Sequence, residues 1–313
     1  MGIRLTATFL DEISDDIPHQ NWGVEEWDRD FAAMKETGID TVVMIRCGAQ
    51  KFITYPSKIL MEEGCHEPPV DLVDMFLTLA EKYGMRYFFG TYTRRKNGEN
   101  TAEEIERSWD QERRLIDEAW ERYGHRKAFA GWYLAKEILY REPAVIAEFR
   151  RYGEHCKKIS GNLPILISPA MWGRKAWDPN DPNARDLNFR AHEQMWDEIM
   201  SEIAGLVDII AFQDGHVTYE ELPEALRINK RLADKYGIEL WTNTESFDRD
   251  MPIRFLPIKW EKMRLKLLAA EQAGIEHAMT FEFSHFMSPN SCYLAAGNLR
   301  RRYLEWLDSR NTK

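Results

Sequence analysis

The chain has 313 residues, 44% of them apolar, with a formal net charge of −10 and a pI of about 5.4. This length and composition predict one large domain over residues 1–313, and the acidity argues against nucleic acid or an anionic membrane as a partner. No apolar run approaches the ~20 residues of a membrane span, the four cysteines lack metal-type spacing, and no signal peptide is visible, so we expect a cytoplasmic protein with reduced thiols.

Short apolar runs rich in β-formers alternate with amphipathic, helix-like stretches along the chain. We predict strands over residues 4–10, 41–46, 86–92, 129–136, 163–168, 208–213, 239–244 and 277–283. Helices are predicted over residues 24–37, 69–83, 101–123, 143–159, 188–204, 219–236, 258–273 and 293–308. Glycines that accept a left-handed backbone past a helix end separate these units: Gly38, Gly84, Gly124, Gly161, Gly205, Gly237 and Gly274. Eight βα units predict an α/β fold, a single (β/α)8 TIM barrel.

The longest irregular segments are residues 11–23, 47–68, 169–187 and 247–257. Each of them follows a predicted strand. In a TIM barrel such loops lie on the C-terminal face, where active sites are built. We therefore expect extended loops around a substrate pocket on that face.

Acidic residues close several of the predicted strands. Strand four ends at Glu137 in GWYLAKE, strand seven ends at Glu245 in ELWTNTE, and Glu282 belongs to strand eight. Asp214 follows strand six in FQDGH. A buried carboxylate is costly without partners, but at a strand tip it can face the pocket. We expect all four acids to open into one pocket.

Hydrolysis of a glycosidic bond requires two carboxyl groups in different protonation states. One donates a proton to the leaving oxygen, and the other, ionised, attacks the anomeric carbon or activates water. Glu137 and Glu245 are the predicted pair. Arg46, Asn243 or Lys136 could hold one acid ionised.

The sequence also resembles a known group of proteins. The segments TFLDEI, HQNWGVEEW, GIDTVVMIR, GWYLAKE, FQDG, WTNTESF and FSHFMSPNS resemble a bacterial family of unknown function that is grouped with the retaining TIM-barrel glycoside hydrolases. The resemblance implies that Glu137 is the acid/base and Glu245 the nucleophile. That superfamily usually has Asn before the strand-four Glu, where it binds the sugar 2-hydroxyl, whereas this chain has Lys136.

Aromatic and polar residues in the predicted top-face loops suit a carbohydrate ligand, because sugar rings stack on aromatic faces and their hydroxyls need directional partners. Trp177 belongs to these loops, as do His19, Gln20 and Asn21. We expect a carbohydrate substrate and neither a metal nor another cofactor. The predicted substrate-binding residues are Trp22, Arg46, Tyr92, Trp172, Gln213, Asp214, Asn243, Glu282 and His285.

Two other functions fit the same pattern. A metal-dependent sugar isomerase or epimerase could use acidic and histidine ligands on this barrel, namely Glu137, Asp214, His216, Glu245 and Glu282. Against it, the fifth predicted strand ends in SPAMW without a ligand. A non-catalytic barrel would bind carbohydrate without turnover. Loss of activity in EDTA with rescue by Mn²⁺ would favour the isomerase.

Overall fold

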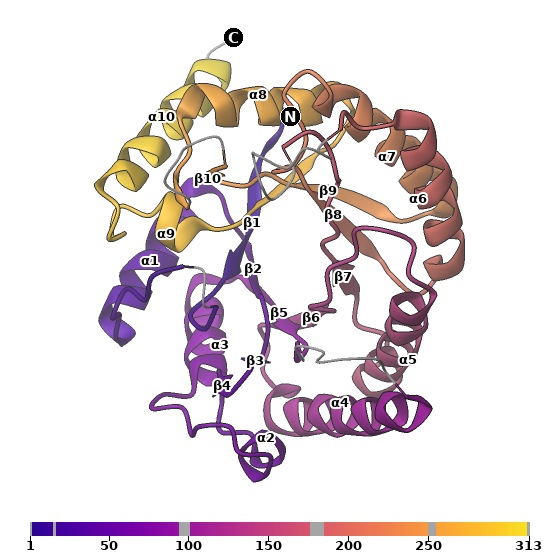
Figure 1. The fold of residues 1–313 in the computed structure, drawn as a ribbon. Coiled ribbons are helices and arrows are strands. Elements are labelled where there is room, and N and C mark those ends of the chain that lie inside the picture. The colour runs from indigo at the N-terminus through magenta and orange to yellow at the C-terminus, as the bar shows by residue number, and fades with distance from the viewer. Residues whose placement is uncertain (1, 15–16, 94–100, 176–184, 250–254, 312–313) are drawn as a thin grey trace.

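The chain folds into a closed barrel of eight parallel strands, as the sequence predicted (Figure 1). The computed structural model describes residues 2–14, 17–93, 101–175, 185–249 and 255–311. The order of the strands around the ring follows the chain, and the last strand closes against the first. The barrel strands are β1 (Arg4–Leu10), β2 (Thr41–Met44), β5 (Arg86–Gly90), β6 (Phe129–Tyr133), β7 (Ile165–Ile167), β8 (Ile209–Gln213), β9 (Glu239–Asn243) and β12 (His277–Thr280).

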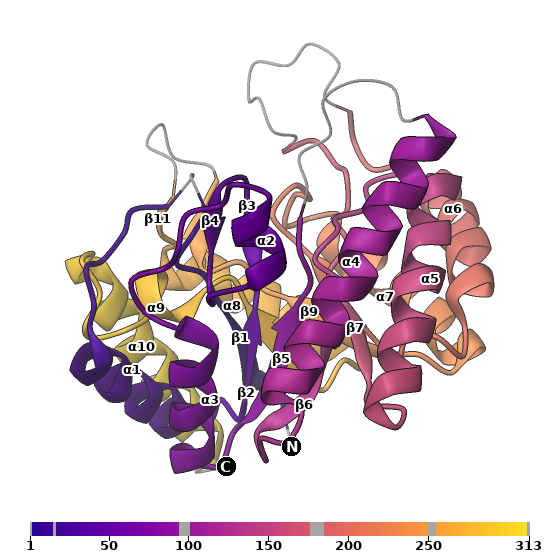
Figure 2. The same ribbon diagram turned by 90° about the horizontal axis from the view of Figure 1, so that it is seen from below.

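Helices surround the barrel and alternate with its strands (Figure 1). The long helices are α1 (Val24–Thr37), α3 (Leu72–Tyr83), α4 (Ala102–Tyr123), α5 (Pro143–Ser160), α6 (Phe189–Ile203), α7 (Leu222–Tyr236), α8 (Trp260–Gln272) and α10 (Leu294–Asn311). Short elements occupy the loops after β2, β9 and β12: β3 (Gly48–Ala49), β4 (Phe52–Ile53), α2 (Lys58–Glu62), β10 (Phe247–Asp248), β11 (Leu256–Pro257) and α9 (Phe283–Phe286). Figure 2 shows β3, β4, α2 and β11 at one end of the barrel and both chain termini at the other.

Two apolar layers stabilise the barrel. The outer layer lies between strands and helices, where Trp27, Trp132 and Trp196 are fully buried. The inner layer fills the barrel with side chains from alternate strand positions, including Phe9, Tyr133 and Trp241, among others. Because successive strand residues face opposite sides, residues two apart face the barrel interior together. This two-residue period decides which residues reach the site described below.

Four strands end earlier in the structure than the sequence predicted. β2, β5, β6 and β12 stop two or three residues before the predicted limits of 46, 92, 136 and 283. After β12 the chain turns into α9, because the side chain of Glu282 caps this helix by accepting hydrogen bonds from the backbone N–H groups of Ser284 and His285. The predicted left-handed backbone conformation is wrong for Gly124, whose φ is −61°. A side chain at this residue would instead overlap the ring of Trp120.

Candidate active site

A cavity of about 500 Å³ opens at the C-terminal ends of the barrel strands. A volume of this size is typical of a small-molecule site. Acidic, basic, amide and aromatic side chains share its wall. The described residues that line it are Phe9, Asp11, Ser14, Ile45, Arg46, Thr93, Tyr133, Ala135, Lys136, Glu137, Leu139, Ala170, Trp172, Gln213, His216, Asn243, Glu245, Phe247, Arg249, Phe255 and Phe281.

The two-residue period of the strands carries Glu137 and Glu245 into this cavity. Tyr133 faces the barrel interior from β6, and Glu137 lies four residues later with the same parity. Trp241 faces the interior from β9, and Glu245 again lies four residues later. β6 and β9 are separated around the ring by β7 and β8. The two glutamates therefore approach the cavity from different strands.

Glu245 is a buried carboxylate held by a fork of hydrogen bonds. Its side chain is 2% exposed, and Arg249 donates from Nε to Oε2 and from a terminal nitrogen to Oε1, both at 2.7 Å. Burial alone raises the pKa of Glu245, but the charge and hydrogen bonds of Arg249, with help from Lys266, outweigh it and lower the pKa below its usual value. The geometry therefore keeps Glu245 ionised.

Gly215 leaves room for this ion pair. A Cβ atom at residue 215 would overlap Glu245 Oε2 and Arg249 Nε. The glycine of the FQDG segment is thus required by close approach to the pair.

Replacing Gly215 by alanine should displace the Glu245 carboxylate and its Arg249 partner, because the added Cβ would overlap both side chains, and should lower the free energy of unfolding by about 1–3 kcal/mol. Urea denaturation would compare this variant with Gly297→Ala, a change on α10 where a Cβ meets Pro289 at 3.5 Å, an ordinary contact distance. Equal stability of the two variants would show that the ion pair accommodates the added Cβ.

Asp214 lies behind Glu245 and not among the described residues that line the cavity. It follows Gln213, which has the inward parity, and so its side chain points toward the helices. There Oδ1 accepts hydrogen bonds from Lys266 Nζ at 2.7 Å and from the backbone N–H of Glu245 at 3.2 Å. Lys266, on α8, also donates to the carbonyl oxygen of Glu245 at 3.2 Å. The Asp214–Lys266 pair therefore fixes the backbone of Glu245 on both sides.

Glu137 is exposed to the cavity and oriented by the amide of Gln213. Gln213 Nε2 donates to Glu137 Oε1 at 3.2 Å and to the carbonyl oxygen of Ser168 at 2.8 Å. The hydroxyl of Ser168 in turn accepts a hydrogen bond from Asn243 Nδ2 at 3.1 Å. Ser168 comes just after β7 and connects these two amides. A lone serine in SPAMW has no distinctive spacing, and so Ser168 could not be selected from its sequence context.

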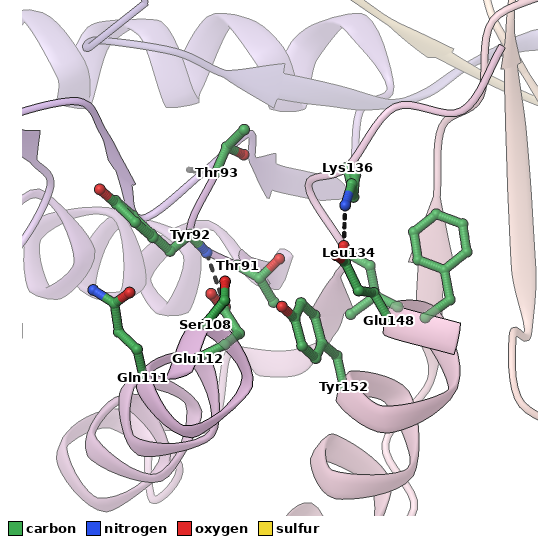
Figure 3. Close-up of a pocket in the computed structure, with 11 residues that line it drawn as sticks. Thr91, Tyr92, Thr93, Ser108, Gln111, Glu112, Leu134, Lys136, Glu148 and Tyr152 are labelled. Carbon is green, nitrogen blue, oxygen red and sulfur yellow. Dashed lines mark hydrogen bonds and ion pairs between the residues drawn. The ribbon is translucent and has the colours of Figure 1, made fainter. Parts of the chain in front are cut away.

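Lys136, which replaces the usual Asn, turns toward a second and smaller pocket of about 50 Å³ (Figure 3). There it forms an ion pair with Glu148 of α5. Tyr92 also lines this pocket, and its backbone N–H donates to Glu112. Burial raises the pKa of Glu112 to about 8, and the hydrogen bond from Tyr92 opposes that shift. Lys136 and Thr93 line both cavities, and so the two adjoin each other.

Glu282 and His285 form a buried cluster that ties the loop after β1 to the end of the barrel. His285 is 1% exposed, and its ring nitrogens face Glu282 Oε1 at 2.5 Å and the carbonyl oxygen of Pro18 at 2.7 Å. Because both partners are acceptors, the geometry fits an imidazolium that donates twice. Burial lowers the pKa of His285, but the charge of Glu282 outweighs it and raises the pKa to about 9.

Alkaline pH should therefore weaken the fold. His285 binds its proton more tightly in the folded chain than in the unfolded one, so its stabilising contribution is complete below about pH 6.5 and is lost as the pH rises through about 9. Burial raises the pKa values of Glu12 and Asp30 to about 7, so the folded chain also binds their protons more tightly than the unfolded chain does. Their stabilising contribution is therefore lost as the pH rises through about 7. We expect the melting temperature to fall steadily between pH 5 and about 9, and His285→Asn to flatten the upper half of that profile. An unchanged upper half in the variant would contradict this assignment.

Aromatic rings cover much of the cavity wall. Trp172 stacks on His216 at 5.1 Å between ring centroids, and Phe9 meets Tyr133 edge-on at 5.1 Å. Burial lowers the pKa of His216, and so does the neighbouring positive charge of Arg249. Trp22 lies elsewhere, packed edge-on against Trp27 of α1. Trp177 falls outside the residues that the structure describes.

The structure thus divides the predicted site residues into two groups. The cavity is lined by Glu137, Glu245, Arg46, Trp172, Gln213 and Asn243. The remaining ones lie outside its described lining: Trp22, Tyr92, Asp214, Glu282 and His285. Other cavity residues were not predicted, above all Arg249, which lies four residues after Glu245, and Asp11, which lies two residues after the inward-facing Phe9.

The described part of the chain contains no group of three or more His, Cys, Asp or Glu side chains that could hold a metal ion. Within the same residues, no helix combines the length and apolar character needed to cross a membrane.

The profile of a family described as a domain of unknown function (DUF4434) matches residues 5–293. The chain belongs to the DUF4434 family. A crystal structure described as that of a "putative alpha-L-fucosidase" from Bacteroides thetaiotaomicron VPI-5482 is 51% identical to this DUF4434 chain, with a TM-score of 0.90. The match covers 98% of this chain and 94% of that one. No curated protein matches the sequence.

More distant structural neighbours are glycoside hydrolases with the same fold. An endo-1,4-β-D-mannanase from Thermotoga petrophila RKU-1 has 12% identity and a TM-score of 0.59, over 96% of the DUF4434 chain and 99% of its own. A psychrophilic glycoside hydrolase family 10 endo-β-1,4-xylanase has 11% identity and a TM-score of 0.55, over 95% and 96% of the two chains. At these identities the likeness concerns the fold.

Proposed function

We propose that this protein is a glycoside hydrolase that uses Glu137 and Glu245 as its two carboxyl groups. One observation carries the proposal: a carboxylate kept ionised by a forked arginine and a second, exposed glutamate line the same cavity. Glycoside hydrolysis needs two acids in such different environments. The aromatic wall supplies faces for sugar rings, and the amides of Gln213 and Asn243 orient polar groups.

In the proposed mechanism Glu245 is the nucleophile and Glu137 the general acid/base. Glu137 protonates the leaving oxygen while Glu245 attacks the anomeric carbon to form a glycosyl ester. Glu137 then takes a proton from water, which cleaves the ester and releases the sugar with its original anomeric configuration. Lys136 is paired with Glu148 in this arrangement, and so we assign the positioning of the sugar to other cavity residues.

A panel of aryl glycosides tests this proposal, and it should include the aryl α-L-fucoside because of the Bacteroides structure. We expect release of the aryl group from at least one member, with NMR showing retention of anomeric configuration in the first product. Inversion would leave a hydrolase but remove the role of Glu245 as nucleophile. Sugar binding without any turnover would support the non-catalytic barrel, and a reaction that EDTA abolishes and Mn²⁺ restores would support the isomerase.

A further inference from the structure

Arg46 faces the cavity, and no described residue forms an ion pair with it. It follows Ile45 just beyond the end of β2, and its half-buried side chain lines the cavity wall. Its Nε atom is buried and has no hydrogen-bond partner. Across the described residues, the structure records no ion pair or hydrogen bond of the Arg46 guanidinium.

The other two strong cations among the described cavity residues already have carboxylate partners. Arg249 is bound by both carboxylate oxygens of Glu245, and Lys136 is paired with Glu148 in the adjoining pocket. Neither of these cations needs a ligand to balance its charge. Arg46 therefore differs from both.

The acids left in the cavity bind uncharged donors. Glu137 accepts its hydrogen bond from the amide of Gln213. Asp11 Oδ1 accepts hydrogen bonds from the backbone N–H groups of Ile13 and Ser14, at 3.2 and 3.0 Å. No described acid thus lies within ion-pair distance of Arg46. A half-buried charge without a partner is costly, and an anionic ligand in the cavity would compensate it.

We infer that Arg46 binds an anionic substituent of the sugar, so that the substrate is an acidic glycoside carrying a carboxylate or a sulfate ester. The planar guanidinium presents paired N–H donors that match the oxygens of either group, and such charge-assisted hydrogen bonds are about twice as strong as neutral ones. A neutral hydroxyl would leave the charge uncompensated. The inference rests on the proposed function, because it assigns the substrate class of the same cavity.

Binding measurements test this inference without requiring turnover. Isothermal titration calorimetry would compare matched pairs of free sugars: D-galacturonate with D-galactose, D-glucuronate with D-glucose, and D-galactose 6-sulfate with D-galactose. Hydrogen bonds to charged groups are stronger than those to neutral ones, so the wild-type protein should bind an acidic member at least about tenfold more tightly than its neutral partner. The sulfate pair distinguishes the two anion sources, because a preference confined to it would identify a sulfated sugar.

Variants of Arg46 assign any preference to this residue. Arg46→Met keeps roughly the length of the side chain and removes its charge, so the preference for the acidic sugar should vanish. Arg46→Lys keeps the charge but loses the paired N–H donors of the guanidinium, so we expect an intermediate preference for the acidic sugar. This variant also tests the inference if Arg46→Met folds poorly. Arg301→Met is the control, because Arg301 is an exposed residue of α10. This variant should bind the acidic and neutral sugars as the wild-type protein does.

The outcomes separate this inference from the proposed function. Neutral sugars that bind as tightly as the acidic ones, with aryl glycosides hydrolysed, would overturn the role of Arg46 and leave the hydrolase standing. An acidic preference that survives in Arg46→Met would also overturn it. Selective, Arg46-dependent binding of acidic sugars without hydrolysis of any glycoside would support the subsite and reject the hydrolase.

Discussion

Glu245→Gln is expected to remove turnover on every glycoside that the wild-type protein cleaves, because glutamine cannot attack the anomeric carbon. Glu137→Gln should lower kcat/KM by about 10²–10⁴-fold on substrates with poor leaving groups. The same variant should lose far less kcat/KM on aryl glycosides with acidic leaving groups, because those groups depart without being protonated. A series of aryl glycosides with graded leaving-group pKa measures both effects.

Chemical rescue and a matched control make this result specific. Azide should restore cleavage by Glu245→Ala and give a glycosyl azide with inverted configuration, because azide then attacks in place of the missing carboxylate. Glu239→Gln changes an exposed acid at the other end of the same strand β9 and should leave activity intact. Equal losses for the Glu137 and Glu245 variants across all leaving groups would reject the division of roles.

Lys266→Met is expected to lower the free energy of unfolding by about 3–5 kcal/mol, because it leaves the carboxylate of Asp214 buried without its counter-ion. The Lys266 side chain is 5% exposed. Asp214 Oδ2 is buried and has no hydrogen-bond partner among the described residues, so water cannot take the place of the lost ammonium group. Burial already raises the pKa of Asp214, and Glu245 adds to this while Lys266 opposes it. Urea denaturation of the variant measures the loss.

A second substitution shows whether the buried charge causes the loss. Asp214→Asn removes the charge but keeps an oxygen for the backbone N–H of Glu245, so Lys266→Met with Asp214→Asn should be more stable than Lys266→Met alone. Lys235→Met, which breaks an exposed pair with Asp197, should change stability within experimental error. A double variant as unstable as Lys266→Met would mean that lost packing, and not the uncompensated charge, dominates.

The rhythm of strands and helices predicted the barrel, and the strand tips predicted part of the cavity lining. Glu137 and Glu245 reach the cavity because they keep the parity of inward-facing Tyr133 and Trp241. Asp214 and Glu282 follow inward positions by one residue, so both point away from the cavity. Parity was available in the sequence, and counting it from the strand centre would have separated these two pairs.

Other features depend on contacts that spacing does not encode. Arg249 reaches Glu245 through the path of the loop after β9. Lys266 reaches Asp214 from a helix 52 residues further along the chain. Ser168 connects Gln213 and Asn243 only because β7, β8 and β9 are neighbours at a given register. Each is a property of the folded chain.

The placement of the termini has a practical consequence for immobilising the protein. β1 begins, and α10 ends, at the face of the barrel opposite the cavity (Figure 2). A tether attached at either end would therefore hold the molecule with its cavity mouth directed toward the surrounding liquid. Bulky or polymeric carbohydrates could then reach the mouth without passing the support, so a bead-bound preparation should retain the substrate range of the free protein.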